Sequence, residues 1–178
     1  MVDKMTVKDK LKGERITLRS YRNSDLAFVS EMWFDKENGK YLCDPEWDYI
    51  DENFVKAVSV IEYSEWGYYF VAELNDTRFL IGSCCAFQDE KNKESYDIGY
   101  CIHKFLWRQG FGVEIVSLLL DWIKSRGGKS VTAEAAKENE ASCALLKKLG
   151  FEVKKEAEFK KYNMGISYKS FIFGKTLN

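Results

Sequence analysis

The chain has 178 residues, of which 46% are hydrophobic and 31% charged, which describes one globular domain with a core of its own. Its formal net charge of −1 argues against the basic surface of nucleic-acid-binding domains. No segment has the roughly 20 apolar residues of a membrane helix, and the charged start does not resemble a signal peptide. We therefore expect a cytoplasmic protein that binds neither nucleic acid nor membrane.

The cysteines and the single histidine indicate an absence of metal and disulfide chemistry. Five cysteines are an odd number, and no two of them show C-x-x-C spacing. We interpret all five as buried thiols in a reducing compartment. One histidine makes a structural or catalytic zinc site improbable, so no metal is expected. The cysteines are Cys43, Cys84, Cys85, Cys101 and Cys143.

The first third of the chain predicts a strand followed by two helices. Residues 1–13 form a polar lead, and the rest of the chain, 14–178, completes a single domain. Alternating apolar residues predict the strand, and a spacing of three and four predicts each helix. The expected elements are a strand at 15–21, a helix from the Asn23-Ser24-Asp25 caps to about Phe34, a loop at 35–47 with the only proline, and a helix from Asp51 to about Tyr63.

The remainder predicts a meander, a buried helix, a crossover and a final hairpin. The expected strands are 68–74, 79–87, 96–102, 129–135, 151–162 and 167–177, and the expected helices are 110–126 and 139–149. The strand after the long helix must return parallel to the 96–102 strand. The order β-α-α-β-β-β-α-β-α-β-β defines a mixed α/β sheet with helices on both faces.

The loop before the long helix has the features of an anion site. Gly110 and Gly112 let a ligand approach the backbone, and the first N–H groups of the helix have no partner within it. The nucleotide-binding Walker pattern fails because Val113 and Glu114 follow Gly112. The dinucleotide fingerprint fails because position 115 is isoleucine. We therefore expect a phosphate-bearing ligand other than those that the Walker and dinucleotide patterns bind.

Two motifs resemble the GNAT N-acetyltransferase superfamily. The W-R-Q-G-F-G loop after a D-I-G-Y strand resembles its acyl-CoA loop, Q/R-x-x-G-x-G/A, and the later run NEASCALLKKLGF resembles its N-x-x-S…L-x-K-L-G-F segment. Trp107 replaces the usual Gln or Arg, a departure typical of the ribosomal-protein N-terminal (Rim-type) branch. The resemblance covers about residues 14–177 and implies the GNAT fold.

The resemblance also implies a cofactor and a reaction. Acetyl-CoA would donate its acetyl group directly to a primary amine, with CoA as product. Asn139 would bond near the pantetheine arm, and a strand N–H, expected to be that of Cys101 or Ile102, would hold the carbonyl oxygen. The expected cofactor-binding residues are Cys101, Ile102, Trp107, Arg108, Gln109, Gly110, Phe111, Gly112, Val113 and Asn139.

Two residues are expected to move protons. Asp97 falls where the Rim-type pattern has Glu, and is equally well explained as a solvated carboxylate at a strand start. Ser142, or a water, would protonate the departing thiolate, because the tyrosine that many relatives place on this helix is Leu146 here. His103 is expected to border the cofactor entrance or to cap a turn.

The acceptor side is expected to come from the first two helices and their loop. This region contains acidic residues that suit a cationic amine and aromatic residues that suit an apolar stem. It contains Asp44, Glu46, Asp48, Asp51 and Glu52, with Trp33, Phe34, Tyr41, Trp47 and Tyr49. The same residues are equally explained as helix-start charges and core aromatics.

Three functions remain open at this point. The first is acetylation of a protein or peptide N-terminus, and the second is acetylation of a small amine such as an antibiotic, a polyamine or an amino-acid derivative. Lys169 stands where the Rim-type branch tends to carry Asp, which weighs against the first. The third is a non-catalytic acyl-CoA-binding module. The protein is expected to be a monomer or a homodimer.

Overall fold

The computed structural model describes residues 10–178 and contains one eight-stranded sheet in the order β1-β2-β3-β4-β5-β6-β8-β7. The strands are β1 (Leu11–Lys12), β2 (Ile16–Ser20), β3 (Tyr68–Leu74), β4 (Leu80–Gln88), β5 (Ser95–Ile102), β6 (Ser130–Ala136), β7 (Glu152–Lys160) and β8 (Ser167–Thr176). The α-helices are α1 (Leu26–Phe34), α2 (Glu52–Ser59), α3 (Phe111–Ser125) and α4 (Glu140–Lys148).

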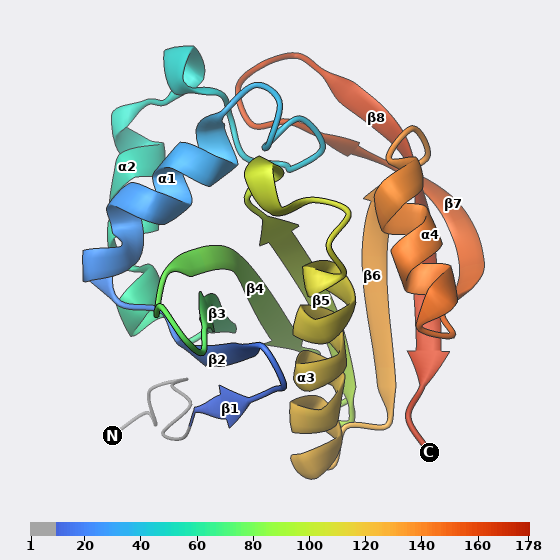
Figure 1. Ribbon diagram of the computed structural model, residues 1–178. Coiled ribbons are helices and arrows are strands. Elements are labelled where there is room, and N and C mark those ends of the chain that lie inside the picture. The colour runs from blue at the N-terminus through green and yellow to red at the C-terminus, as the bar shows by residue number, and fades with distance from the viewer. Residues whose placement is uncertain (1–9) are drawn as a thin grey trace.

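One parallel pair interrupts an otherwise antiparallel sheet. β5 and β6 run in the same direction and are joined by α3, which confirms the predicted crossover. All other neighbouring strands are antiparallel. In Figure 1, β5 and β6 lie together at one end and move apart toward the end where α3 begins. The fold is therefore a mixed α/β sheet of the expected kind.

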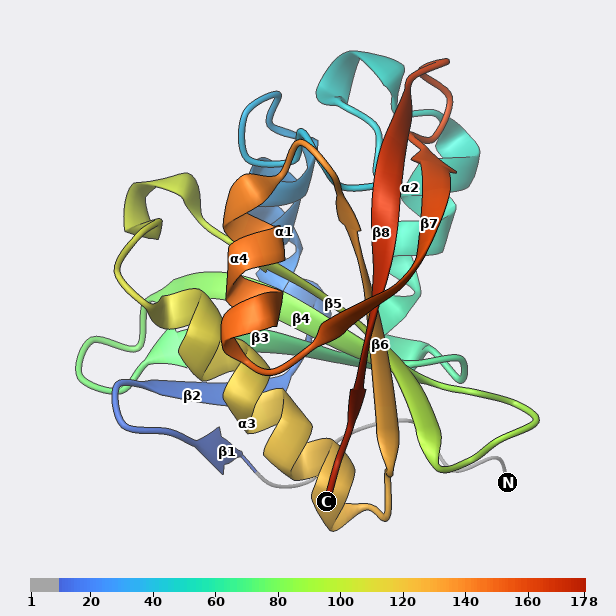
Figure 2. The same ribbon diagram turned by 90° about the vertical axis from the view of Figure 1, so that its right-hand side faces the viewer.

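Two apolar layers hold the helices on opposite faces of the sheet. α3 supplies the larger layer through fully buried side chains such as Ile115, Leu119 and Ile123. α1 packs a smaller layer through Val29 against Val71 of β3. Figure 2 shows β2, β3 and β4 between α1 above and α3 below. The central strands β3 and β4 are therefore covered on both faces, and most of their residues are buried.

The structure corrects several expectations from the sequence. The part of the polar lead that it describes includes β1, which pairs with β2, while residues 1–9 lie outside the described chain. The second helix ends at Ser59, and Ile61–Tyr63 form a separate 3₁₀ turn. All five cysteines are free thiols, but Cys43 is exposed and Cys85 only half-buried. β1 has only two residues and the 3₁₀ turn only three, so neither gives a residue pattern long enough to recognise in the sequence.

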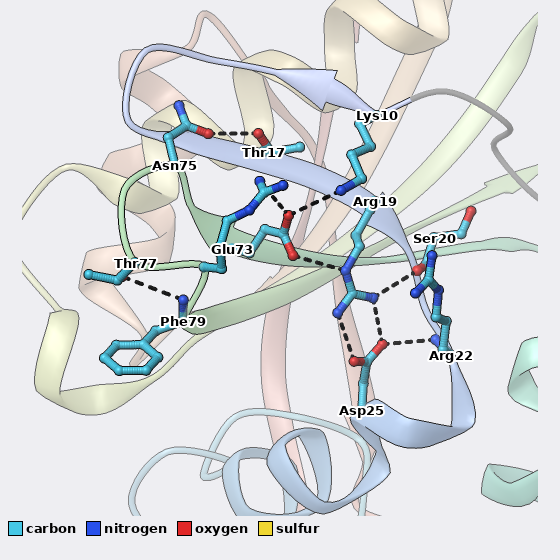
Figure 3. Close-up of polar contacts among 11 residues, drawn as sticks. Lys10, Thr17, Arg19, Ser20, Arg22, Asp25, Glu73, Asn75, Thr77 and Phe79 are labelled. Carbon is cyan, nitrogen blue, oxygen red and sulfur yellow. Dashed lines mark hydrogen bonds and ion pairs between the residues drawn. The ribbon is translucent and has the colours of Figure 1, made fainter.

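A buried ion-pair network fixes the start of α1 to the sheet. The Arg19 guanidinium donates to both carboxylate oxygens of Asp25 at 2.8 Å and to Oε2 of Glu73 at 3.0 Å (Figure 3). Asp25 and Glu73 are only 4% and 6% exposed, and the two carboxylates raise the pKa of Arg19. Asp25, expected to cap the helix, instead accepts from the Arg22 N–H at 2.9 Å. The guanidinium therefore balances the charge of Asp25 and shares Glu73 with Arg78 at 2.9 Å and Lys10 at 3.6 Å.

Arg19→Met should destabilise the protein by about 3–5 kcal/mol, because it leaves the buried Asp25 carboxylate without its cation, whereas Glu73 keeps Arg78 and Lys10. Urea unfolding followed by circular dichroism would measure this as a lower midpoint at unchanged slope. Lys154→Met is the control, since the ion pair of Lys154 with Glu152 joins two exposed residues and should contribute under about 1 kcal/mol. Equal midpoints for the two variants would contradict the role assigned to Arg19.

Candidate active site

The centre of the site is the gap between β5 and β6. Their pairing runs from Ser95 opposite Ser130 to Ile98 opposite Ala133 and stops there, although both strands continue. The His103 N–H donates to the Ile81 carbonyl at 2.9 Å, so by alternation Cys101 N–H is directed at β4 and Ile102 N–H at the gap. Of the two donors expected from sequence, the pairing favours Ile102. The Tyr100 N–H has the same direction, which sequence analysis did not identify.

The turn before α3 has the backbone geometry of an anion cradle. Arg108 and Gly110 have left-handed φ angles of 65° and 83°, and α3 begins at Phe111. The N–H groups of Phe111, Gly112 and Val113 lie in the first turn of the helix, at its positive end. A Cβ at Gly112 would lie 2.6 Å from Cδ1 of Leu145 on α4, so a larger residue would require the Leu145 side chain to move. Gly110 thus shapes the turn, and Gly112 lets α3 and α4 approach.

Arg15 braces this turn from β1–β2, a contact that the sequence did not predict. Its Nη1 donates to the Gln109 carbonyl at 3.0 Å and its Nε to Glu114 at 3.0 Å. The guanidinium also lies 4.3 Å from the centre of the Phe111 ring. Arg15 is the donor in both hydrogen bonds, so these contacts use none of the N–H groups of the turn.

The side chains of the loop itself have different roles. Trp107 Nε1 donates to the Ile102 carbonyl at 2.8 Å, which ties the loop to the end of β5. Gln109 Nε2 donates to the Phe105 carbonyl at 3.3 Å, so its side chain turns back onto the loop and does not line the cavity described below. Arg108 is exposed and lines that cavity, where its charge can reach an anion.

A cavity of about 950 Å³ passes through the gap between the strands. Its lining includes Tyr100 and Ile102 from one face of β5 and Asp97 and Gly99 from the other, so it opens on both faces of the sheet. One half is bounded by the α3 turn and the start of α4, with Arg108 and Lys148 as its basic residues. The other half is bounded by Tyr41, Cys43, Phe87, Glu134 and Phe159. We call these the cofactor half and the acceptor half, after the ligands that the sequence motifs lead us to expect there.

The start of α4 contributes a hydroxyl pair. Asn139 caps the helix as predicted, and its side-chain oxygen accepts from the Ser142 N–H at 3.2 Å. The Ser142 hydroxyl lies 2.8 Å from the Tyr100 hydroxyl, inside the cavity. Burial raises the pKa of Tyr100 to about 12, so the phenol keeps its proton at neutral pH. Leu146 is fully buried in the core.

Asp97 is exposed to solvent at the surface of the acceptor half. The Thr132 hydroxyl, its partner in the parallel pairing, donates to its Oδ1 at 2.6 Å. The surrounding protein nevertheless removes part of its hydration, which raises the pKa of Asp97 from its ordinary value, and the charge of Glu134 adds to this. A carboxylate with a raised pKa is a better proton acceptor than a free one.

Most of the predicted acceptor residues lie outside the cavity. Asp51 caps α2 by accepting from the Phe54 N–H at 2.8 Å, and Phe34 packs against Trp47 at a centroid distance of 5.1 Å. Of the ten residues predicted from this region, only Tyr41 lines the cavity. The acidic lining of the acceptor half instead includes Asp97 and Glu134, from two adjacent strands. Asp97 and Glu134 come close together only through the register of β5 and β6, which could not be read from the sequence.

A buried lysine fixes the wall of the acceptor half. Lys161, only 3% exposed, donates to the Gly39 carbonyl at 2.9 Å and the Leu42 carbonyl at 3.1 Å. The Tyr162 N–H donates to the Cys43 carbonyl at 2.8 Å, and burial lowers the pKa of Lys161. The loop after α1 is thereby attached to the end of β7. Sequence analysis missed this contact because 119 to 122 residues separate the partners.

His103 does not belong to the cavity. Its Nδ1 accepts from the Phe105 N–H at 3.4 Å, so it caps the 3₁₀ turn Lys104–Leu106, one of its two expected roles. Within residues 10–178 no three His, Cys, Asp or Glu residues are grouped to hold a metal ion. None of the helices in the described part of the chain is long and apolar enough to cross a membrane.

Comparison with known proteins agrees with this geometry. The family model of the acetyltransferase (GNAT) domain matches residues 15–152. The uncharacterized N-acetyltransferase YoaA of Bacillus subtilis is 25% identical over 166 residues, 92% of this chain and 94% of that protein. The chain therefore belongs to the GNAT acetyltransferase family, and it is an acetyltransferase.

Two solved structures share the fold. Spermidine N-acetyltransferase from Vibrio cholerae, in complex with CoA and spermine, superposes with a TM-score of 0.76 at 17% identity, over 92% of this chain and 96% of that one. Ribosomal-protein-S5-alanine acetyltransferase from Vibrio fischeri gives 0.73 at 18% identity, over 95% and 97%. At these identities the likeness concerns the fold, and it covers enzymes with a small and with a protein acceptor.

Proposed function

We propose that this acetyltransferase binds acetyl-CoA in the cofactor half of the cavity and transfers the acetyl group directly to a primary amine in the acceptor half. The observation that carries the proposal is a cavity that passes between two diverging parallel strands beside a glycine turn at a helix start. Such a passage lets a cofactor and an acceptor meet from opposite faces of the sheet. The donor set fits a phosphate-bearing thioester.

The chain offers separate groups for each part of this cofactor. The first N–H groups of α3 and the charge of Arg108 would bind the diphosphate. The Asn139 amide would bond the pantetheine arm, and Ile102 N–H would donate to the carbonyl oxygen of the acetyl group. Bound acetyl-CoA supplies the acetyl group as an activated thioester. These backbone donors are fixed by the sheet before the ligand arrives.

Two proton transfers are needed, and the groups for them would lie on opposite sides of the gap. Asp97, directly or through one water, would take the proton from the acceptor ammonium. Ser142, held by Asn139 and hydrogen-bonded to Tyr100, would give a proton on the opposite side. Tyr100, which the sequence did not suggest as part of the proton path, would pass its proton to Ser142 in the same step and regain one from water in the cavity that it lines.

The preferred acceptor is a protein or peptide N-terminus, as the Rim-type motif implies. An α-amino group has a pKa of about 7.7–8.0 and needs only a weak base, whereas a lysine-type amine, at about 10.4, needs more help. A small amine is the second candidate, and the acidic acceptor half favours it because such an amine is a cation. Free-CoA release measured on a panel of peptides and small amines decides between the two.

Tyr100→Phe and Ser142→Ala should each slow thiol release modestly, by about five- to tenfold, because a thiolate of pKa about 8.5 leaves without much assistance. If the hydroxyls act as one path, the double variant should lose no more than either single variant. Stopped-flow detection of free CoA measures this. Ser125→Ala, at the far end of α3, is the control, and full activity in Ser142→Ala would assign the proton to water instead.

A further inference from the structure

Glu134 shares a face of the sheet with the base candidate. Asp97 lies opposite Thr132 in the parallel pairing, and Glu134 is two residues beyond Thr132 on β6, so both carboxylates project to the same side. Both line the acceptor half of the cavity. Strand rise and spacing alone would place their Cα atoms roughly 8 Å apart, and the divergence of β5 and β6 beyond Ala133 adds to this.

The fold holds Glu134 in place with a buried hydroxyl. Ser170 on β8 is fully buried, and its Oγ donates a short hydrogen bond to Oε1 of Glu134. Glu134 itself is exposed into the cavity mouth. One oxygen is thus used for orientation, and the other remains available to a ligand.

The described protein side chains form no ion pair with either of these two carboxylates. None of the ion pairs among residues 10–178 includes Asp97 or Glu134. The basic residues that line the cavity, Arg108 and Lys148, belong to the cofactor half. One reacting ammonium balances one carboxylate, so a second negative charge remains in the acceptor half.

We propose, building on the function proposed above, that Glu134 is a specificity-determining residue that binds a second positive charge on the acceptor, several bonds away from the amine that Asp97 serves. The aromatic rings of Phe87 and Phe159 line the same half and suit the apolar stem between the two charges. The acceptor is therefore a diamine-like cation: either a small diamine or a peptide N-terminus followed closely by a lysine.

The test compares acceptors that differ by one charge, at saturating acetyl-CoA, by free-CoA release. One arm uses propylamine against 1,3-diaminopropane and 1,4-diaminobutane, and the other uses two peptides that differ only by Ala or Lys at the second residue. The wild type should prefer the dication in at least one arm by about tenfold in kcat/KM, the ratio that corresponds to roughly 1.4 kcal/mol of binding. The arm that shows the preference identifies the source of the acceptor.

Glu134→Gln should reduce that preference to about one, acting mainly on KM, while the acetyl-CoA-induced rise in melting temperature stays unchanged. Glutamine can still accept from Ser170, so the variant should fold. Glu152→Gln, an exposed glutamate on β7 outside the cavity, is the matched control and should keep the wild-type preference.

Two results would overturn the inference: a wild type that treats monocations and dications alike, or a Glu134→Gln variant that keeps the preference. Release of CoA with every acceptor and no charge preference would refute this inference alone. No thermal shift with acetyl-CoA and no release with any acceptor would refute the proposed function as well.

Discussion

Gly110→Trp is expected to abolish the stabilisation that acetyl-CoA gives the wild-type protein. At a ligand concentration about 100 times Kd, mass action should add about 2.7 kcal/mol and raise the melting temperature by roughly 5–10 °C. Gly110 has φ of 83°, which disfavours any side chain, and it directly precedes the first N–H groups of α3. A Cβ there lies 3.4 Å from Arg15 Nη2, so an indole would displace Arg15 and, with the strained φ, distort the turn that presents these N–H groups; the shift should disappear in differential scanning fluorimetry.

The same helix provides a matched control at its other end. Gly127 has φ of 81°, and nothing lies within 4 Å of a Cβ added there. Gly127→Trp therefore imposes a similar backbone strain without touching the proposed site. Both variants should melt below the wild type, but only Gly127→Trp should retain the acetyl-CoA shift. A retained shift in Gly110→Trp would remove the turn from the cofactor site.

Asp97→Asn is expected to lower turnover about 100-fold, the effect of losing a general base. In the wild type the rate should rise as the pH increases through the raised pKa of Asp97, because only the ionised carboxylate can accept a proton. Asparagine accepts no proton at any pH. The rate of the variant should therefore depend only on deprotonation of the acceptor amine, which has a pKa of about 7.7–8.0 for an α-amine. The deficit should be largest below that pH.

A pH-rate profile of steady-state CoA release measures both effects. Asp121→Asn, an exposed aspartate on α3, is the control and should leave the profile unchanged. Asp97→Glu should recover part of the activity, since it restores a carboxylate one methylene longer. Identical profiles for the wild type and Asp97→Asn would exclude Asp97 as the base.

Much of the fold follows from local signals in the sequence. The apolar α3, with Gly110 before it and Gly127 after it, was predictable because helix ends and buried faces leave regular patterns. The cap at Asn139 was predictable for the same reason. The parallel crossover followed from the helix between two strands. These features depend on residues close together in the chain.

The parts that sequence analysis missed depend on strand register or on long-range contacts. The Tyr100–Ser142 hydrogen bond joins β5 to α4, and Glu134 becomes a neighbour of Asp97 only through the pairing of β5 with β6. The acidic residues predicted within Asp44–Glu52 do not line the cavity, and Asp51 instead caps α2. Local composition identified acidic and aromatic residues without placing them.

Lys161 has a consequence for how an acceptor enters. Its ammonium holds the carbonyls of Gly39 and Leu42 from inside the protein, so the loop after α1 cannot swing away without leaving a charge stranded in the interior. A wall fastened in this way does not act as a lid. Acceptor association should therefore be a single diffusive step into a rigid opening, with no slow closing phase after mixing.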